Sequence, residues 1–196
     1  MTIRLLGVCG SMRTGSFSSR LADLVLAAAR EHGAETRLLE LNTLDLPTYN
    51  PDKESLDHAG LLGATEAVNW ADTFVLASPD YHGAMSGAMK NFLDFYWAEF
   101  AGKLFGYVCA SHEKGLTVME NMRTSVRQCY GWSLPYGLSV YGEKDFDSSG
   151  QLTGPVARRL RMLARDLVVY GALIRGQFQA DLGDRVTETF AARYYD

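Results

Sequence analysis

Short apolar segments alternate with segments of helical periodicity along most of this chain, and this alternation restricts the possible folds more than any other feature. Nearly continuous apolar runs of this kind are typical of strands buried on both faces of a parallel sheet. Because a crossover helix joins parallel neighbours, the alternation predicts an α/β doubly wound sheet with right-handed crossovers. The apolar runs occupy residues 3–9, 36–41, 72–78, 103–110 and 136–142.

The segments that follow the runs carry the helical pattern. In the first of them, Phe17, Leu21 and Leu24 recur at spacings i, i+4 and i+7, which indicates one buried helical face. The alternation ends near residue 171, which predicts a domain over residues 1–171 and a C-terminal extension over 172–196 that packs on the domain or on a partner subunit. Further helices are expected around residues 61–68, 85–96, 116–126 and 156–167.

Composition narrows the classes of partner. The chain has 196 residues, of which 47% are hydrophobic, and a net charge of −4, which suits one domain with a full core and argues against nucleic acid or a basic membrane-binding surface. No apolar run approaches the roughly 18 residues that span a bilayer, so a cytoplasmic protein is expected. Three cysteines without a CxxC spacing and four scattered histidines favour reduced thiols and no metal site.

In a doubly wound sheet, ligands bind beyond the carboxyl ends of the strands. The first such loop reads "GSMRTGSFS" over residues 10–18, and the next helix begins near Ser16. The free N–H groups of that helix carry the positive end of its dipole, Ser11 and Ser18 add hydroxyls, and Arg13 adds a cation. This combination predicts a phosphate site. Ordinary N-capping by Ser16 in a solvated loop is the alternative.

Spacing excludes three other phosphate-handling loops. Gly7, Gly10 and Gly15 do not have the separations of G-x-G-x-x-G, and no Gly-Lys-Ser/Thr of a P-loop is present. Low-molecular-weight tyrosine phosphatases place more residues between their Cys and Arg than the three that separate Cys9 from Arg13. Cys9 also lies in an apolar run, so it is interpreted as a core thiol.

Two more loops are expected at the same edge. Pro79 stiffens the chain before residues 80–83, a turn with exposed amides in which Tyr81 and His82 supply flat rings. Such a turn suits a planar heterocycle, although an ordinary turn is the alternative. The fourth apolar run ends in residues 111–115, which bring further donors to the start of a helix.

Two motifs carry a resemblance to a known family. The loop "GSMRTGSFS" resembles the Gly-Ser-x-Arg-x-x-Ser-x-(Asn/Ser) phosphate loop of the flavodoxin-like NAD(P)H-dependent FMN reductases, which include quinone, azo-dye and chromate reductases. The segment "SPDYHGAMSGAMKNFLDF" resembles that family's (Thr/Ser)-Pro-Glu-Tyr-Asn-x-x-x-x-x-x-Leu-Lys-Asn-x-(Ile/Leu)-Asp segment. The resemblance covers most of residues 1–170 and implies a flavodoxin-like five-stranded parallel sheet in the order 2-1-3-4-5, with helices on both faces.

The resemblance also implies FMN as cofactor and NADPH or NADH as reductant. Asp80 stands where the family has Glu, His82 where it has Asn, and "SHEKG" where it has a glycine-rich loop. The implied positions are Ser11, Arg13, Ser16, Phe17 and Ser18 around the FMN phosphate, Pro79, Asp80, Tyr81, His82 and Gly83 along the isoalloxazine, and Ser111 and His112 near its pyrimidine edge.

The expected activity is transfer of hydride from NAD(P)H through flavin N5 to a small acceptor, such as a quinone or free flavin, with ping-pong kinetics. No side chain is assigned as a catalytic residue. A flavodoxin-type one-electron carrier and an FMN-binding sensor without turnover are the alternatives. Flavodoxins have a Thr-rich phosphate loop with no Arg at the position of Arg13, which favours the reductase.

The helix expected over residues 84–100 carries aromatic and aliphatic residues almost all round. A helix that is apolar on every side is buried, so one face is expected on the sheet and the other against a partner. This pattern predicts a homodimer, or a dimer of dimers, through that helix. Cover by the C-terminal extension is the alternative.

Overall fold

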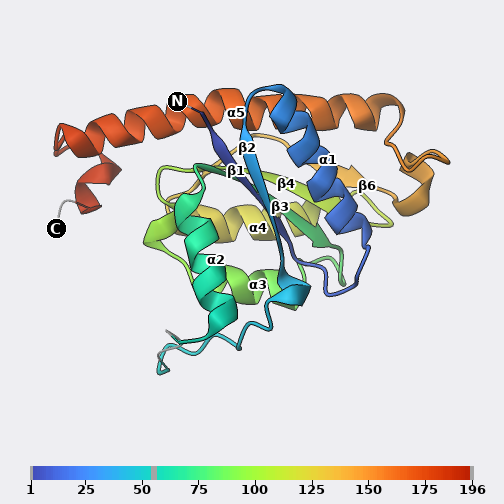
Figure 1. Ribbon diagram of the computed structural model, residues 1–196, viewed down its shortest axis with the longest axis horizontal. Coiled ribbons are helices and arrows are strands. Elements are labelled where there is room, and N and C mark those ends of the chain that lie inside the picture. Colours follow the sequence, from blue (N-terminus) through green and yellow to red (C-terminus); the bar gives the residue numbers. More distant parts are fainter. Residues whose placement is uncertain (1, 54–56, 195–196) are drawn as a thin grey trace.

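The computed structural model describes residues 2–53 and 57–194, and its centre is a parallel sheet with helices on both faces (Figure 1). The sheet order is β2-β1-β3-β4-β5, and β6 also pairs with β4. The predicted order 2-1-3-4-5 and the doubly wound α/β class are therefore confirmed. The strands are β1 (Arg4–Cys9), β2 (Glu35–Glu40), β3 (Thr73–Pro79), β4 (Leu104–Ala110), β5 (Trp132–Ser133) and β6 (Leu138–Val140).

The last strand position is divided between two short strands. β5 pairs with the beginning of β4, and β6 pairs with its end, both in parallel. Between them Leu134 still donates its N–H to the Phe105 carbonyl at 2.9 Å, but Pro135 has no N–H to continue the ladder. The single strand expected over 136–142 is therefore shorter, at Leu138–Val140, and is preceded by a separate one.

The sheet divides the core into two layers, and helices cover each of them (Figure 1). Leu5 and Val75 point into the cluster formed with α1 and α5, whereas Phe74 and Leu76 point into the cluster formed with α2, α3 and α4. The alternation follows from the two-residue period of a strand. The helices are α1 (Phe17–Glu31), α2 (Ala59–Trp70), α3 (Gly87–Asp94), α4 (Leu116–Gln128) and α5 (Gly154–Gly183).

Helix α5 is a single element of 30 residues, so the expected division between residues 171 and 172 falls inside it. Gly171 has a packing role there, because a Cβ at this position would lie 2.2 Å from Cγ2 of Thr73. Beyond it, Phe178 packs with Ala101 and Ala191 near the amino ends of the strands. Residues 195–196 of the expected extension lie outside the described part. No described helix is long and apolar enough to cross a membrane.

The helix expected over residues 84–100 is shorter. Helix α3 ends at Asp94, Trp97 has a non-helical backbone, and a 3₁₀ turn follows at Ala98–Phe100. Phe92, Tyr96 and Phe100 are buried within the chain, whereas the ring of Trp97 is exposed. The aromatic residues around this segment therefore belong largely to the core of the subunit, which removes much of the sequence argument for a partner.

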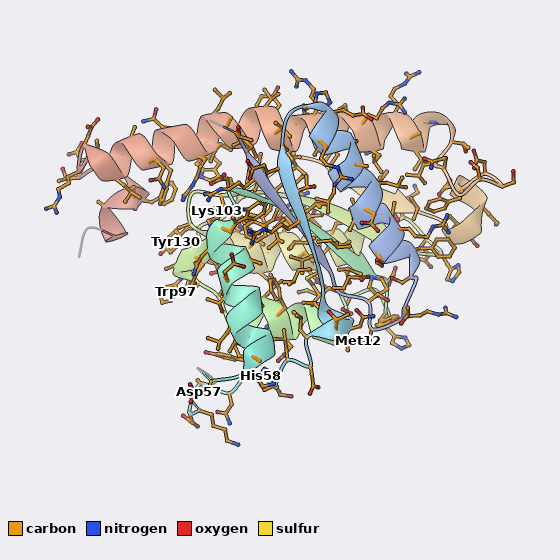
Figure 2. All side chains as sticks on the ribbon, in the orientation of Figure 1. Met12, Asp57, His58, Trp97, Lys103 and Tyr130 are labelled. Carbon is orange, nitrogen blue, oxygen red and sulfur yellow. The ribbon has the colours of Figure 1, made fainter. Side chains whose placement is uncertain are left out.

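All carboxyl ends of the parallel strands lie at one edge of the sheet, here called the ligand edge. Met12 marks this edge in Figure 2, in the loop after β1, and Lys103 marks the opposite edge, directly before β4. Three loops predicted to carry chemistry, at residues 10–16, 80–86 and 111–115, leave β1, β3 and β4 at the ligand edge.

Candidate functional site

The first loop ends in a capped helix. Ser16 has an extended backbone, and its Oγ accepts a hydrogen bond from the Ser19 N–H at 3.1 Å, so α1 begins at Phe17 as predicted. Ser11 is buried, and its Oγ accepts from the Arg13 N–H at 3.2 Å. These bonds hold the loop so that the positive end of α1 opens at the ligand edge.

The loop after β1 is hydrogen-bonded to the N-cap of α3, the helix that follows the third loop. Ser86 caps α3 by accepting from the Met89 N–H at 3.1 Å, and its Oγ donates to the Gly10 carbonyl at 2.5 Å. A Cβ on Gly10 would lie 2.8 Å from Cβ of Met89 and 2.9 Å from Oγ of Ser86, so the close approach requires glycine. Two loops separated by about 70 residues in the sequence therefore form one rigid wall.

The third loop is a tight turn with an unusual backbone. Tyr81 and Ala84 exchange both backbone hydrogen bonds at 3.1 Å, and the two residues between them, His82 and Gly83, have φ values of 57° and 78°. Positive φ at both central positions defines a type I′ turn, in which Asn-Gly is the preferred pair. Histidine is one of the few other residues that tolerate this conformation.

Asp80 joins the third loop to the fourth. Its Oδ1 accepts from the Gly83 N–H at 2.8 Å, and its Oδ2 accepts from the Ser111 hydroxyl at 2.6 Å. Ser111 is buried, and its Oγ also accepts from the Glu113 N–H at 3.0 Å. Because protein donors occupy both carboxylate oxygens, Asp80 acts as a brace between the loops.

These loops enclose a cleft of about 590 Å³. Its volume lies within the roughly 300–1,000 Å³ of small-molecule sites. His82 and Gly83 instead line an adjoining hollow of about 890 Å³, which shares Asp80, Ser111 and His112 with the cleft. The cleft is lined by the remaining predicted residues, namely Ser11, Arg13, Ser16, Phe17, Ser18, Pro79, Asp80, Tyr81, Ser111 and His112.

A further part of the cleft wall was missed by the sequence analysis. Gly142 lines it from the loop after β6, and Arg20 lines it from α1. The Arg20 guanidinium lies 4.3 Å from the centre of the Phe146 ring and donates to the Gly150 carbonyl at 3.1 Å, so it holds the 142–152 loop against α1. The rule that ligands lie beyond strand ends applies to the fifth apolar run as well and would have included Gly142.

No cysteine is among the described residues that line the cleft. Cys9 is buried in β1, and burial raises the pKa of its thiol, so the thiol remains protonated at neutral pH. Its Sγ lies 3.9 Å from Oγ of Ser16, and both atoms are buried beneath the loop. Among the described residues, no group of three or more His, Cys, Asp or Glu side chains is placed to hold a metal ion.

Comparison with known proteins places this site in context. The family model described as NADPH-dependent FMN reductase matches residues 3–144. The NADPH-dependent FMN reductase ArsH of Shigella flexneri is 27% identical over 199 residues, covering 97% of this chain and 76% of that protein. An NADPH azoreductase of Bacillus sp. (strain OY1-2) is 33% identical over 104 residues, covering 52% of this chain and 58% of that protein.

Solved structures show the same fold. The apo form of an NADH:FMN oxidoreductase (EMOB) superposes with a TM-score of 0.74 at 20% identity, covering 86% of this chain and 90% of that one. The flavoenzyme NAD(P)H:(acceptor) oxidoreductase FerB of Paracoccus denitrificans gives 0.75 at 16% identity, covering 88% and 98%. Since the family model spans well over half of the chain, the chain belongs to the NADPH-dependent FMN reductase family and is an oxidoreductase that uses FMN with NADPH or NADH.

Proposed function

We propose that this chain holds FMN in the ligand-edge cleft, accepts hydride from NADPH or NADH, and reduces a small acceptor such as a quinone or free flavin, with ping-pong kinetics. Bound FMN would supply the hydride-transfer chemistry, and the chain would supply binding and orientation. The observation that carries the proposal is the convergence of three separate loops on one cleft beside the positive end of α1.

The phosphate end of FMN fits residues 11–18. The Oγ of Ser18 is buried and has no hydrogen-bond partner among the described residues. A buried hydroxyl without a partner is costly, and an added acceptor at the N-terminus of α1 would satisfy it. Arg13 is exposed at the cleft rim with no ion pair to any described residue, so its guanidinium is available to a phosphate.

The ring end fits the turn at residues 80–83 and the start of the fourth loop. We propose that backbone amides of this turn face the isoalloxazine, while the Asp80–Ser111 hydrogen bond sets the separation of the two loops. The exposed rings of Tyr81 and His112 border the cleft and would enclose first the nicotinamide and then the acceptor. No protein nucleophile or general base is needed for this role of the chain.

Steady-state turnover tests the proposal. Protein incubated with FMN should oxidise NADPH or NADH continuously in the presence of a quinone, with parallel lines in double-reciprocal plots as the acceptor is varied. A one-electron carrier would bind FMN yet give no continuous nucleotide oxidation with the quinone alone. A sensor would bind FMN without oxidising either nucleotide, and each of these results would contradict the proposed function.

Assembly through residues 84–100 stays a prediction. Trp97, with 64% of its surface exposed, is the large apolar side chain that this segment still offers to a partner. We propose a homodimer or a dimer of dimers in which this side chain is covered, with Trp97→Ser expected to lower the molar mass measured by light scattering. An unchanged mass would remove this segment from the interface.

A further inference from the structure

A second hollow lies beside the ligand edge, over the edge strand β6 and between the first turns of α4 and α5. It has a volume of about 450 Å³, and we call it the basic groove. Its walls combine three cations with apolar side chains from both helices. The residues used in the argument are Lys114, Arg158, Arg159, Leu116, Val156 and Met162.

The basic groove and the proposed flavin site adjoin the same third hollow. The hollow that adjoins the cleft shares Asp80, Ser111 and His112 with it, and the same hollow shares Lys114 and Leu116 with the basic groove. The three hollows therefore lie in series, as a track of neighbouring spaces along the ligand edge from the start of α1 to the start of α5. A track of this kind suits an extended ligand with two separate ends.

Two cationic side chains of the basic groove are available to bind an anion. Lys114 and Arg158 are exposed and have no hydrogen bond or ion pair with any described residue. Arg159 donates its Nε–H to the Gly137 carbonyl at 2.7 Å and lies over the Tyr136 ring, which fixes its guanidinium in the wall. None of the described residues lining the groove is acidic, although the chain as a whole carries a net charge of −4.

The groove also offers apolar surface for a flat base. Leu116 is 62% exposed and Met162 is 43% exposed, so both present apolar surface to the groove. A cationic wall next to exposed Leu and Met surfaces matches a phosphorylated nucleoside, with the phosphate on the cations and the base on the apolar side.

We propose that the basic groove binds the adenosine 2′-phosphate end of NADPH while its nicotinamide end reaches the cleft. This inference rests on the proposed function and extends it to the choice of nucleotide. NADH lacks the 2′-phosphate and leaves Lys114 and Arg158 without a partner, so the groove selects NADPH.

A binding measurement tests the groove without turnover. Adenosine 2′,5′-bisphosphate and 5′-AMP are titrated into FMN-treated protein by calorimetry. The bisphosphate should bind more tightly than AMP, and Lys114→Ala/Arg158→Ala should weaken it by about tenfold or more, as expected for lost charged hydrogen bonds. Arg161→Ala, an exposed cation on the same helix but outside the groove, is the matched control. Equal binding of both nucleotides, or no effect of the double variant, would overturn the inference.

Kinetics separate this inference from the proposed function. In the double variant, kcat/KM for NADPH should fall by about tenfold or more, whereas that for NADH should stay within about twofold, which also shows that the variant is folded. Equal losses for both nucleotides, or an unchanged preference, would overturn the inference alone while wild-type turnover upholds the proposed function. A wild-type chain that oxidises neither nucleotide would contradict the proposed function itself.

Discussion

At the scale of single residues, the phosphate end of the site depends most on Arg13. It is exposed at the cleft rim and has no ion pair among the described residues, so its loss should not disturb the fold. We expect Arg13→Ala to raise the dissociation constant for FMN by about tenfold or more, because one charged hydrogen bond is removed. Fluorescence titration measures this, with Arg30→Ala at the other end of α1 as control. Equal affinities for the two variants would remove Arg13 from the site.

Substitutions of His82 test the backbone conformation of the turn rather than the reaction. Its φ of 57° suits Asn and disfavours a β-branched side chain. We expect His82→Val to lower the free energy of unfolding by about 1–3 kcal/mol and His82→Asn to change it by less than about 0.5 kcal/mol. Urea unfolding gives both values. His32→Val, at an exposed histidine with φ of −98°, is the control and should be near neutral. A neutral His82→Val would show that the turn is not strained.

The residues that sequence analysis placed well are those governed by local rules. Ser16 was expected near the start of a helix because an N-cap depends only on its neighbours, and the structure has it there. Gly142 could have been included by the strand-end rule, whereas Arg20 was missed because its place depends on tertiary contacts with the loop over residues 142–152. The brace between Asp80 and Ser111 was unpredictable for the same reason, since it joins residues from two strands' ends.

At the scale of elements, Ser86 links the first loop to α3. Its hydroxyl accepts from the Met89 N–H and donates to the Gly10 carbonyl, and both bonds are buried. Ser86→Ala removes a helix cap and leaves a buried carbonyl without this donor, so we expect the free energy of unfolding to fall by about 1–3 kcal/mol. Weaker FMN binding should accompany it, because the first loop loses its support.

Ser125→Ala provides the comparison for this prediction. The Ser125 hydroxyl donates to the Asn121 carbonyl on the surface of α4, so its removal should change stability by less than about 0.5 kcal/mol. Chemical unfolding of both variants decides the matter. If the two substitutions cost the same, the hydrogen bond between Ser86 and Gly10 contributes nothing measurable.

Helical and strand periodicity predicted which elements exist better than where they end. The strand expected over 103–110 is observed at Leu104–Ala110, because a buried central strand is apolar throughout. The helix expected over 84–100 ends at Asp94, since its apolar residues enter the core in a 3₁₀ turn as readily as in a helix. Apolar content alone does not distinguish these conformations.

At the scale of the whole molecule, the two ends of the strands differ in role. The carboxyl ends form the ligand edge, and the amino ends form the opposite edge, here called the structural edge. Lys103 at the structural edge is buried, and its Nζ donates to the Val68 carbonyl at 2.8 Å (Figure 2). Burial, with the nearby Arg175 charge, lowers the pKa of Lys103 to about 8, although Asp72 opposes this. Between about pH 8 and the ordinary pKa near 10.5, the unfolded chain binds more protons than the folded chain.

The free energy of unfolding should therefore gain a contribution that rises with pH across this window. Lys103→Met lacks the titrating group, so the stability of the wild type relative to this variant should be lowest below about pH 8 and should increase toward about pH 10. Urea unfolding of both proteins at several pH values measures the difference. A difference that does not change with pH would show that Lys103 titrates normally in the folded protein.

The full length of α5 was not accessible to sequence analysis. The alternation of apolar and helical segments ends near residue 171, yet α5 continues through Gly171 to Gly183. The missing Cβ lets the helix pack against Thr73 of β3, a contact between residues about 100 positions apart that no local pattern reveals. The sheet order, in contrast, accompanied the family resemblance and is confirmed by the strand pairing.

Every proposed role of this chain requires that the ligand-edge cleft holds FMN. Titration of flavin-free protein with FMN, followed by equilibrium dialysis and visible absorbance, tests this directly. We expect saturable binding of one FMN per chain, weakened by Arg13→Ala and unaffected by Arg30→Ala. Absence of saturable binding at excess FMN would contradict it.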